Sequence, residues 1–482
     1  MRSEQQIKYT IQASSPEAHL FTIDCHISQP DPVGQLVSLP AWIPGSYMIR
    51  DFAKNIIRMN AATLNGKTLA VTRVNKSTWK IEACNEAITI NYEVYAWDLS
   101  VRMAHLDTTH AFFNGSSVFI EVNGQADLPC LVEILCPEGN QYKDWRVATS
   151  MTRATARAYG FGGYVAQNYD ELIDHPVEMG NFTLASFEAA GIPHDIVVTG
   201  RHQADMERLC NDLKKICETH IEMFGDLPPI DRYVFLVMAV GNGYGGLEHR
   251  SSTSLLCSRN DLPSKQQPRI TEAYRTFLGL CSHEYFHTWN VKRIKPRAFI
   301  PYNLSKETHT RQLWAFEGIT SYYDDLCLVR SGLIDINSYL ELLGQNATRV
   351  WRGKGRFKQS VTDSSFDAWS KFYQQDENAP NAIVSYYTKG AVIALALDMT
   401  LRQYSNNTTS LDDLMRLLWQ DYGKTAVGLD ETEIEKLASD LVDFDLSDFF
   451  KRYLYSTEDI PLTELLAFTG IDFTLRVATG PD

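Results

Sequence analysis

The stretch TEAYRTFLGLCSHEYFHTWN, residues 271–290, has apolar residues on most sides of a helical projection, which predicts a buried helix. It contains the pattern His-Glu-x-x-His, in which His283 and His287 stand four positions apart. Residues at i and i+4 lie on one face of a helix, so both imidazoles can reach one zinc ion. Glu284 then lies beside the metal and can take a proton from the attacking water. The motif predicts a zinc hydrolase with one zinc ion per chain.

A third protein ligand is needed, because a catalytic zinc ion takes three ligands and keeps one open position. The predicted third ligand is Glu317, within the apolar stretch LWAFEGITSYY (313–323). An acidic side chain in such a stretch is costly unless it is paired or bound to a metal. A salt bridge from Glu317 to Arg311 is the alternative interpretation, and Glu307 and His309 are the fallback ligands.

The chain on either side of this region predicts a multidomain α+β protein, because 482 residues exceed the usual size of one core. Early segments alternate apolar and polar residues, as strands do. Buried strands are predicted at 195–200 (DIVVTG) and 232–240 (RYVFLVMAV), and helical spacing dominates after residue 333. The predicted parts are a β-rich domain 1–168, a zinc catalytic domain 169–330, an α-helical domain 331–465, and a strand-like final segment 466–482.

Helix ends in the second half of the chain carry local signals. Ser331–Gly332 is a predicted C-cap, and 389–404 (KGAVIALALDMTLRQY) is a predicted apolar helix. Ser410–Asp413 and Asp430–Glu433 each have the spacing of a capping box, which predicts that a helix begins at each of them.

The composition excludes several classes of protein. A net charge of −14 argues against a nucleic-acid footprint, which needs clustered Lys and Arg. The nine cysteines include no C-x-x-C pair and have irregular spacing, so we expect neither a disulfide framework nor a cysteine zinc site. The N-terminus lacks the apolar core of a signal peptide, and no apolar run is long enough to span a membrane. We therefore expect a cytoplasmic protein with a peptide as its partner; the sequence does not indicate its oligomeric state.

Five segments of the chain carry a family resemblance. They are AWIPGSYMIRDF (41–52), GNGYGGLEHRSST (241–253), HEYFHTWNVKRIKP (283–296), LWAFEGITSYY (313–323) and SYYTKGAVIALALD (385–398). Together they resemble the glycyl aminopeptidase family of zinc metallopeptidases, which is related to aminopeptidase N and thermolysin. The resemblance implies a β-rich N-terminal domain, a thermolysin-like catalytic domain and a helical domain. A C-terminal PDZ domain usually follows, and residues 466–482 are a candidate for the start of a truncated one.

The resemblance also implies a role for a tyrosine in SYYTKG. Tyr387 matches the Y-x-K-G position, whose tyrosine stabilises the oxyanion in related aminopeptidases, and Tyr386 is the neighbouring alternative. A donor of this kind helps because negative charge builds on the carbonyl oxygen during attack. Packing in a core is the other interpretation of either ring, since the chain has 23 tyrosines.

The segment Gly245-Gly246-Leu247-Glu248-His249 resembles the G-x-M-E-N exopeptidase motif. Glu248 is therefore the expected anchor for the α-amino group of the substrate. Gly245 and Gly246 are expected to let an edge strand approach the substrate backbone closely. His249 replaces the usual Asn.

Other polar and aromatic residues near these motifs have ordinary interpretations. Trp42 and Tyr47 either close the substrate pocket or belong to a core. Asp324 or Asp325 is a weaker candidate for orienting a zinc histidine. The basic run after the zinc helix is expected to be a solvated loop rather than a carboxylate site; its members are Lys292, Arg293, Lys295 and Arg297.

These observations predict a zinc-dependent aminopeptidase that removes N-terminal residues from peptides. A preference for glycine or alanine follows from the resemblance alone. The first alternative is a zinc endopeptidase, in which Glu248 has only a structural role. The second is a non-catalytic peptide-binding scaffold with a structural metal, which has no use for a base at Glu284.

Overall fold

The computed structural model describes residues 6–477. The chain forms two compact units whose segments alternate along the sequence. The first unit contains Met1–Lys214, Pro229–Glu284 and Asn303–Glu307, and the second contains Lys215–Pro228, Tyr285–Tyr302 and Thr308–Asp482. The domain boundaries predicted after residues 168, 330 and 465 stay predictions.

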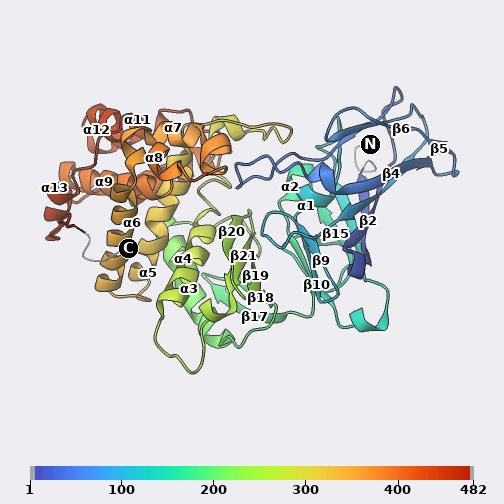
Figure 1. Cartoon of the computed structure of the whole chain (residues 1–482), viewed down its shortest axis with the longest axis horizontal. Helices are drawn as coiled ribbons and strands as arrows, with labels where there is room; N and C mark the ends of the chain where they lie inside the picture. The colour runs from blue at the N-terminus through green and yellow to red at the C-terminus, as the bar shows by residue number, and fades with distance from the viewer. Residues whose placement is uncertain (1–5, 478–482) are drawn as a thin grey trace. The chain divides into compact units, whose positions relative to one another are not determined.

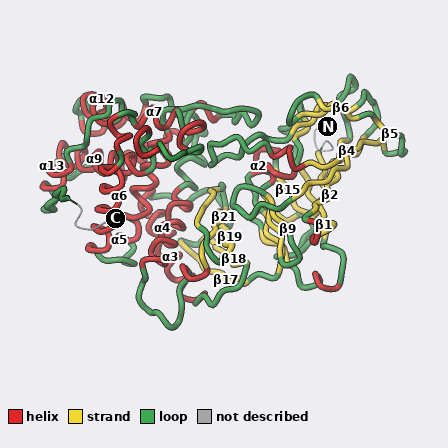
Figure 2. The backbone as a smooth tube through the Cα atoms, viewed as in Figure 1, coloured by secondary structure: helices red, strands yellow, loops and turns green. Residues whose placement is uncertain are grey.

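The N-terminal part of the first unit is built from β-sheets, as predicted (Figure 2). Strands β2 and β8 alternate buried and half-buried residues, because successive side chains of a strand point to opposite faces. The largest sheet has eight strands in the order β14-β15-β12-β1-β2-β8-β4-β5. Its strands are β1 (Ile7–Ser15), β2 (Leu20–Ile27), β4 (Ile56–Thr63), β5 (Thr68–Leu69), β8 (Ile88–Tyr95), β12 (Cys130–Leu135), β14 (Thr152–Arg153) and β15 (Gly162–Ala166).

Two four-stranded sheets complete this part, in the orders β13-β16-β10-β9 and β11-β3-β7-β6. Two short helices, α1 (Gly115–Val118) and α2 (Tyr169–Ile173), lie along the same part of the chain. The strands are β3 (Leu36–Ser38), β6 (Val71–Arg73), β7 (Thr78–Ile81), β9 (Ala104–Leu106), β10 (His110–Phe113), β11 (Glu121–Val122), β13 (Arg146–Ala148) and β16 (Val177–Gly180).

A five-stranded sheet, with the order β17-β18-β19-β21-β20, forms the rest of the first unit's β-structure. Strands β18, β19 and β21 run parallel, while β20 pairs antiparallel with β21 at the edge. The predicted strands at 195–200 and 232–240 correspond to β18 and β19. The bounds are β17 (Thr183–Ala189), β18 (Ile192–Thr199), β19 (Tyr233–Val240), β20 (Tyr244–Glu248) and β21 (Ser252–Ser258).

Helices α3 (Met206–Phe224) and α4 (Glu272–Phe286) contribute residues to both units. All helices after them belong to the second unit (Figure 1). They are α5 (Thr320–Arg330), α6 (Ile336–Arg352), α7 (Val361–Phe366), α8 (Ala379–Ala382), α9 (Thr388–Tyr404), α10 (Leu411–Leu418), α11 (Glu433–Val442), α12 (Ser447–Tyr453) and α13 (Leu462–Ala467). The predicted multidomain α+β fold, with a helical C-terminal part, is confirmed. Among the described residues, no helix is long and apolar enough to cross a bilayer.

Most of the predicted helix signals are confirmed. Helix α5 ends at the predicted C-cap, where Gly332 has a φ of +70°. The predicted apolar helix is α9, and Ser410–Asp413 forms a capping box at the start of α10. Asp430–Glu433 forms no such box, because Thr432 is the N-cap of α11.

The final segment differs from its prediction. Residues 471–477 have no regular secondary structure, because no neighbouring strand of the described chain pairs with them. Residues 478–482 of the predicted segment 466–482 lie outside the described residues.

A glycine contact brings two helical segments of the second unit together. Gly318 lies in η6, a π-helical turn (Trp314–Ile319), and Gly390 lies in α9. A Cβ atom on Gly318 would lie 2.6 Å from the Cα of Gly390 and 2.9 Å from the carbonyl oxygen of Tyr386. The two backbones therefore touch at a point where no side chain fits.

We expect Gly318→Ala to destabilise the protein by about 1–3 kcal/mol, because the added methyl group meets backbone that has to move. Urea denaturation followed by circular dichroism measures this change. Gly344→Ala in α6 is the matched control, since a Cβ atom there meets open space. The control is expected to gain about 0.5–1 kcal/mol from the lower flexibility of the unfolded chain. Equal stability of the two variants would contradict this account of the glycine contact.

Candidate metal centre

The motif histidines lie at the C-terminal end of α4. His283 is in the last turn of the helix, and His287 directly follows the final helical residue, Phe286. The helix thus begins one residue later and ends four residues earlier than the predicted stretch 271–290. Tight turns continue the backbone, with Asn290 N–H donating to the Phe286 carbonyl at 3.2 Å. The two histidines keep their i and i+4 relation.

Glu317 lies in the π-helical turn η6. Its Oε2 is 3.3 Å from Nε2 of His287, and both side chains are only 2% exposed. Single π-helical turns occur frequently at functional sites, where the extra residue in the turn redirects a side chain. The sequence pattern placed Glu317 correctly in an apolar interior but did not indicate this turn.

Asn290 connects the two ligand segments. Nδ1 of His287 lies 2.8 Å from the backbone oxygen of Asn290, which orients the ring and leaves Nε2 for a metal. The side chain of Asn290 donates to the carbonyl of Ala315 at 3.0 Å and to Oγ1 of Thr320 at 3.1 Å. Sequence reasoning missed Asn290; its position three residues after the second histidine was the only signal.

The ligand atoms of His283, His287 and Glu317 lie within 4.8 Å of one another. In a tetrahedral zinc site with bonds of about 2.0–2.1 Å, ligand atoms are about 3.3 Å apart. The 3.3 Å separation of His287 and Glu317 therefore matches one edge of such a tetrahedron. Two imidazoles and one carboxylate fit a catalytic zinc ion.

Glu284 is 4% exposed and lies against Gly246 of β20. A Cβ atom on Gly246 would overlap the Glu284 carboxylate. Glycine at this position therefore makes room for the predicted base. The sequence had suggested another role for it, namely to let the substrate backbone come close. Carboxylate atoms of Glu284 and Glu248 lie within 4.8 Å of each other and of His287.

Glu248 ends the edge strand β20 and is 4% exposed. Its carboxylate lies against Gly45, where a Cβ atom would be 2.5 Å from Oε2. Gly45 has a φ of +92°, which favours glycine, and belongs to the segment 41–52. Gly245 is half-buried on the same strand, and Arg102 donates to the Gly246 carbonyl at 3.3 Å. The contact between Gly45 and Glu248 was not predicted from either motif.

The two candidate tyrosines differ in their surroundings. Tyr386 is fully buried, and Tyr387 is partly exposed at the start of α9. Their ring centroids are 4.7 Å apart. Burial, together with the charges of Tyr373 and Glu317, raises the pKa of Tyr386 well above its usual value. The Tyr387 hydroxyl lies 3.3 Å from the Tyr373 hydroxyl, a contact that the sequence did not indicate.

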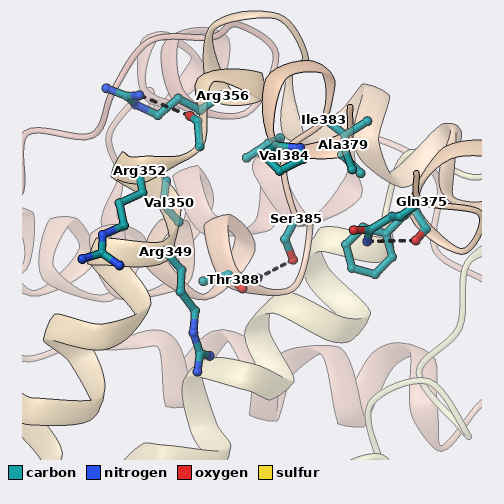
Figure 3. Close-up of a pocket in the computed structure, with 13 residues that line it drawn as sticks. Arg349, Val350, Arg352, Arg356, Gln375, Ala379, Ile383, Val384, Ser385 and Thr388 are labelled. Atoms are coloured by element: carbon teal, nitrogen blue, oxygen red, sulfur yellow. Dashed lines mark hydrogen bonds between the residues drawn. The ribbon is translucent and has the colours of Figure 1, made fainter. Parts of the chain in front are cut away.

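A cavity of about 410 Å³ lies at the start of α9 (Figure 3). Phe372 in its wall stacks on the ring of Tyr387 at 5.6 Å. The wall also carries three arginines, of which Arg356 is paired with Asp459 at 3.0 Å. None of the predicted site residues lines this cavity, so it is separate from the cluster around His287.

Neither fallback ligand belongs to this cluster. The fallback ligands Glu307 and His309 are exposed, and His309 Nδ1 pairs with the Phe366 carbonyl at 2.9 Å. Asp325 accepts a hydrogen bond from Asn346 at 3.3 Å.

Trp42, Tyr47 and His249 belong to the interior. Trp42 and Tyr47 are fully buried, and the indole N–H of Trp42 is 2.8 Å from the Asn303 carbonyl. His249, which replaces the motif's Asn, lies 3.3 Å from Asp174.

The prediction of a solvated basic loop is wrong for part of the run. Lys292 and Lys295 are buried, and Lys295 Nζ lies 4.6 Å from the centre of the Tyr302 ring. Arg293 donates to the Thr288 carbonyl at 2.6 Å. These local partners replace water, whereas Arg297 is exposed and pairs with Asp430, as a surface residue does.

Comparisons with known proteins identify the family of the chain. Residues 8–181 match the Peptidase M61 N-terminal domain, and residues 276–393 match the M61 glycyl aminopeptidase family. No curated protein matches the chain. A crystal structure of an aminopeptidase N family protein from Idiomarina loihiensis is 49% identical, with a TM-score of 0.94 over 96% of this chain and 78% of that chain.

A more distant similarity shows the fold alone. An M1 zinc metallopeptidase mutant from Deinococcus radiodurans, bound to a Tyr-Ser-Ala substrate, is 11% identical, with a TM-score of 0.57 over 95% of this chain and 94% of that chain. A second structure of that mutant is similar at 10% identity and a TM-score of 0.57, over 95% of each chain. Since both family models match and the Idiomarina relative is 49% identical over most of both chains, the chain belongs to the M61 glycyl aminopeptidase family of metallopeptidases.

Proposed function

We propose that this chain is a zinc-dependent aminopeptidase that removes small N-terminal residues, glycine or alanine, from peptides. The observation that carries the proposal is the cluster of His283, His287 and Glu317, whose ligand atoms lie within 4.8 Å of one another. Zinc, when bound there, activates water and polarises the scissile carbonyl. The preference for small residues rests on the family name.

Glu284 is the proposed general base. Its carboxylate is buried and lies within 4.8 Å of a ring nitrogen of His287, so it would lie beside a water bound to a metal held there. Glu284 takes the proton of the attacking water and later gives it to the leaving amine. Gly246 supports this role, because any side chain there would displace the carboxylate.

Tyr387 is the proposed donor to the oxyanion. It is the partly exposed member of the tyrosine pair, whereas Tyr386 is closed off from solvent. Phe372 stacks on its ring, and the Tyr373 hydroxyl lies 3.3 Å from its own, so the side chain has a defined orientation. A preorganised donor of this kind is effective because it need not reorient during the reaction.

Glu248 is the proposed anchor of the substrate α-amino group. Its Oε1 has no hydrogen-bond partner among the described residues, although the side chain is buried. A buried carboxylate oxygen without a partner is costly, and a substrate ammonium group removes that cost. The position of Glu248 on an edge strand also lets a peptide approach along β20.

The cellular location remains part of this proposal. No disulfide joins any of the nine cysteines in the part of the chain that the structure describes, and Cys136 is exposed. Chains without disulfides are typical of reducing compartments, and we propose the cytoplasm.

Glu284→Gln is expected to keep its zinc and to lose about 10²- to 10⁴-fold in kcat, because only the proton acceptor is removed. Metal analysis and hydrolysis of a glycine arylamide measure the two properties. Glu272→Gln, at the exposed first turn of the same helix, is the control and is expected to behave as wild type. Full activity of Glu284→Gln would exclude Glu284 as the base.

Tyr387→Phe is expected to lower kcat by about 10²- to 10³-fold with little change in KM, because the lost hydrogen bond forms chiefly in the transition state. Tyr386→Phe is the matched neighbour and is expected to keep its kcat. Steady-state kinetics of both variants test the assignment. A large loss of kcat in Tyr386→Phe alone would reverse the two roles.

Wild-type protein is expected to cleave peptides with a free N-terminus and to leave N-acetylated peptides intact. Glu248→Gln is expected to lower kcat/KM for the free peptides by about 10²- to 10³-fold, because a buried charge pair with the substrate is lost. Glu188→Gln, exposed on β17 at the other edge of the same sheet, is the control. Equal rates on free and acetylated peptides would favour the endopeptidase alternative.

A further inference from the structure

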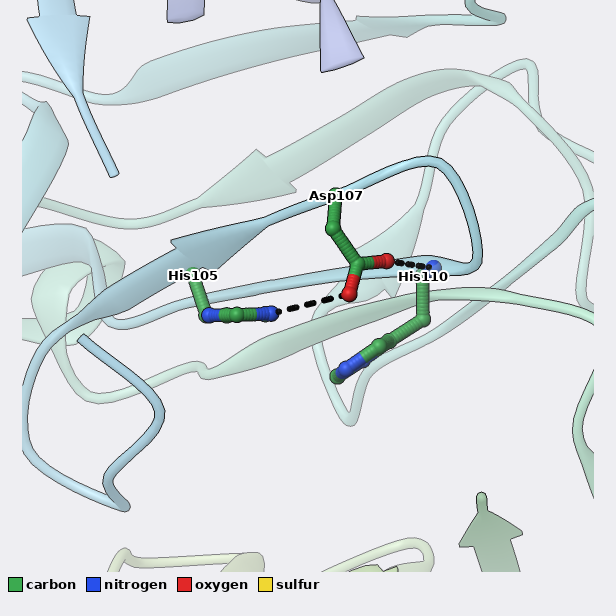
Figure 4. A group of neighbouring side chains, drawn as sticks. All are labelled: His105, Asp107 and His110. Carbon is green, nitrogen blue, oxygen red and sulfur yellow. Dashed lines mark hydrogen bonds and ion pairs between the residues drawn. The ribbon is translucent and has the colours of Figure 1, made fainter. Parts of the chain in front are cut away.

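A second group of metal-ligand side chains lies in the N-terminal part of the first unit. The segment HLDTTH (105–110) forms the turn between β9 and β10, and it places His105, Asp107 and His110 together (Figure 4). In this hairpin His105 is paired with Phe112. His110 stands two residues before Phe112, so it is the diagonal neighbour of His105 on the same face of the sheet. The ring centroids of His105 and His110 are 5.0 Å apart.

The geometry of this group resembles that of the cluster around His287. One ligand atom from each of the three side chains lies within 4.8 Å of the others. Nε2 of His105 is 3.4 Å from Oδ2 of Asp107. That separation is long for a charge-assisted hydrogen bond, which is usually about 2.7–2.9 Å. It is close to the tetrahedral edge of about 3.3 Å between ligands of one zinc ion.

Neighbouring side chains orient these ligands. Oε1 of Glu178, on β16, is 3.0 Å from Nδ1 of His110 and leaves Nε2 of that ring to bind a metal. A carboxylate behind a ligand histidine is the usual supporting contact in zinc proteins. Oδ1 of Asp107 accepts hydrogen bonds from the N–H groups of Thr109 and His110, at 2.6 and 3.0 Å. Trp97 stacks on the ring of His105 at 4.9 Å.

We propose that His105, Asp107 and His110 bind a second divalent transition-metal ion, separate from the one at His283, His287 and Glu317. Two imidazoles and a carboxylate suit zinc, and a water completes the coordination. The ion joins the two strands of the β9–β10 hairpin at their turn, and Glu178 links it to β16 through His110. Its role is to hold this hairpin in the sheet.

The test measures metal content in the full-length protein. Purified protein is stripped with a chelator, reloaded with Zn²⁺, freed of excess by gel filtration and analysed by mass spectrometry. We expect two zinc equivalents in wild type and one in His105→Ala. The His105→Ala variant keeps its peptidase activity, since it lies outside the catalytic cluster. His283→Ala also keeps one equivalent but loses activity, so failure of this proposal is distinguishable from failure of the proposed function.

Two further variants test whether a lost zinc equivalent is due to misfolding or to the loss of any histidine. Asp107→Asn keeps an oxygen for the turn hydrogen bonds and removes the ligand charge, and it is expected to lose the same zinc equivalent. His26→Ala, at a half-buried histidine of β2, is the matched control and keeps two equivalents. One equivalent in wild type that vanishes in His283→Ala would overturn the proposal, because the hairpin is then only a hydrogen-bonded turn. Two equivalents in both His105→Ala and Asp107→Asn would also overturn it.

Discussion

The pairing of His287 with Glu317 is the contact on which the proposed metal centre depends. The two side chains are 3.3 Å apart and almost completely removed from water. Burial of an acidic group is costly without a compensating charge, so the interior has to supply a cation or a proton at this point. Asn290 makes the arrangement rigid, because its backbone oxygen orients one ligand while its side chain holds the turn that carries the other. The proposed metal centre therefore needs both the motif helix and the segment that follows it.

Glycines provide the space around the charged groups. Gly246 faces the carboxylate of Glu284, Gly45 faces that of Glu248, and Gly318 lets η6 meet α9. At each of these places the group opposite the glycine meets backbone atoms rather than a flexible side chain. A backbone neighbour restricts the motion of a carboxylate more than a long side chain does, which favours the preorganisation that catalysis requires. The carboxylates of Glu284 and Glu248 thus fit in their positions because Gly246 and Gly45 have no side chain.

The sequence predicted the parts of this protein that depend on local spacing. The i and i+4 relation of His283 and His287 survives even though the helix ends at Phe286, because the distance between them is set within one turn. Glu317 was predictable since an acidic residue in an apolar stretch needs a special reason to be there. The alternation of strands β2 and β8 follows from the same kind of local rule.

Features that depend on distant contacts were not predictable. The contact between Gly45 and Glu248 joins residues about two hundred positions apart. The hydrogen bond from the Asn290 side chain to the Ala315 carbonyl joins the two ends of a long loop. The basic run was misjudged because charge in a sequence indicates solvent only when no internal partner is present, and the Tyr302 ring supplies one for Lys295. His105, Asp107 and His110 stand close in the sequence, yet only the hairpin register brings their side chains to one face.

The π-helical turn at Trp314–Ile319 has a consequence for how this chain tolerates changes in length. Such a turn holds one residue more than an α-helical turn. Removing one residue from it would restore an ordinary helix and rotate everything beyond the deletion by about 100°. A deletion before Glu317 would then turn its side chain away from His287, although no residue has been substituted. Surface turns such as that at Asn65–Gly66 have no such coupling, so insertions and deletions should accumulate there during evolution and be purged from the turn that carries Glu317.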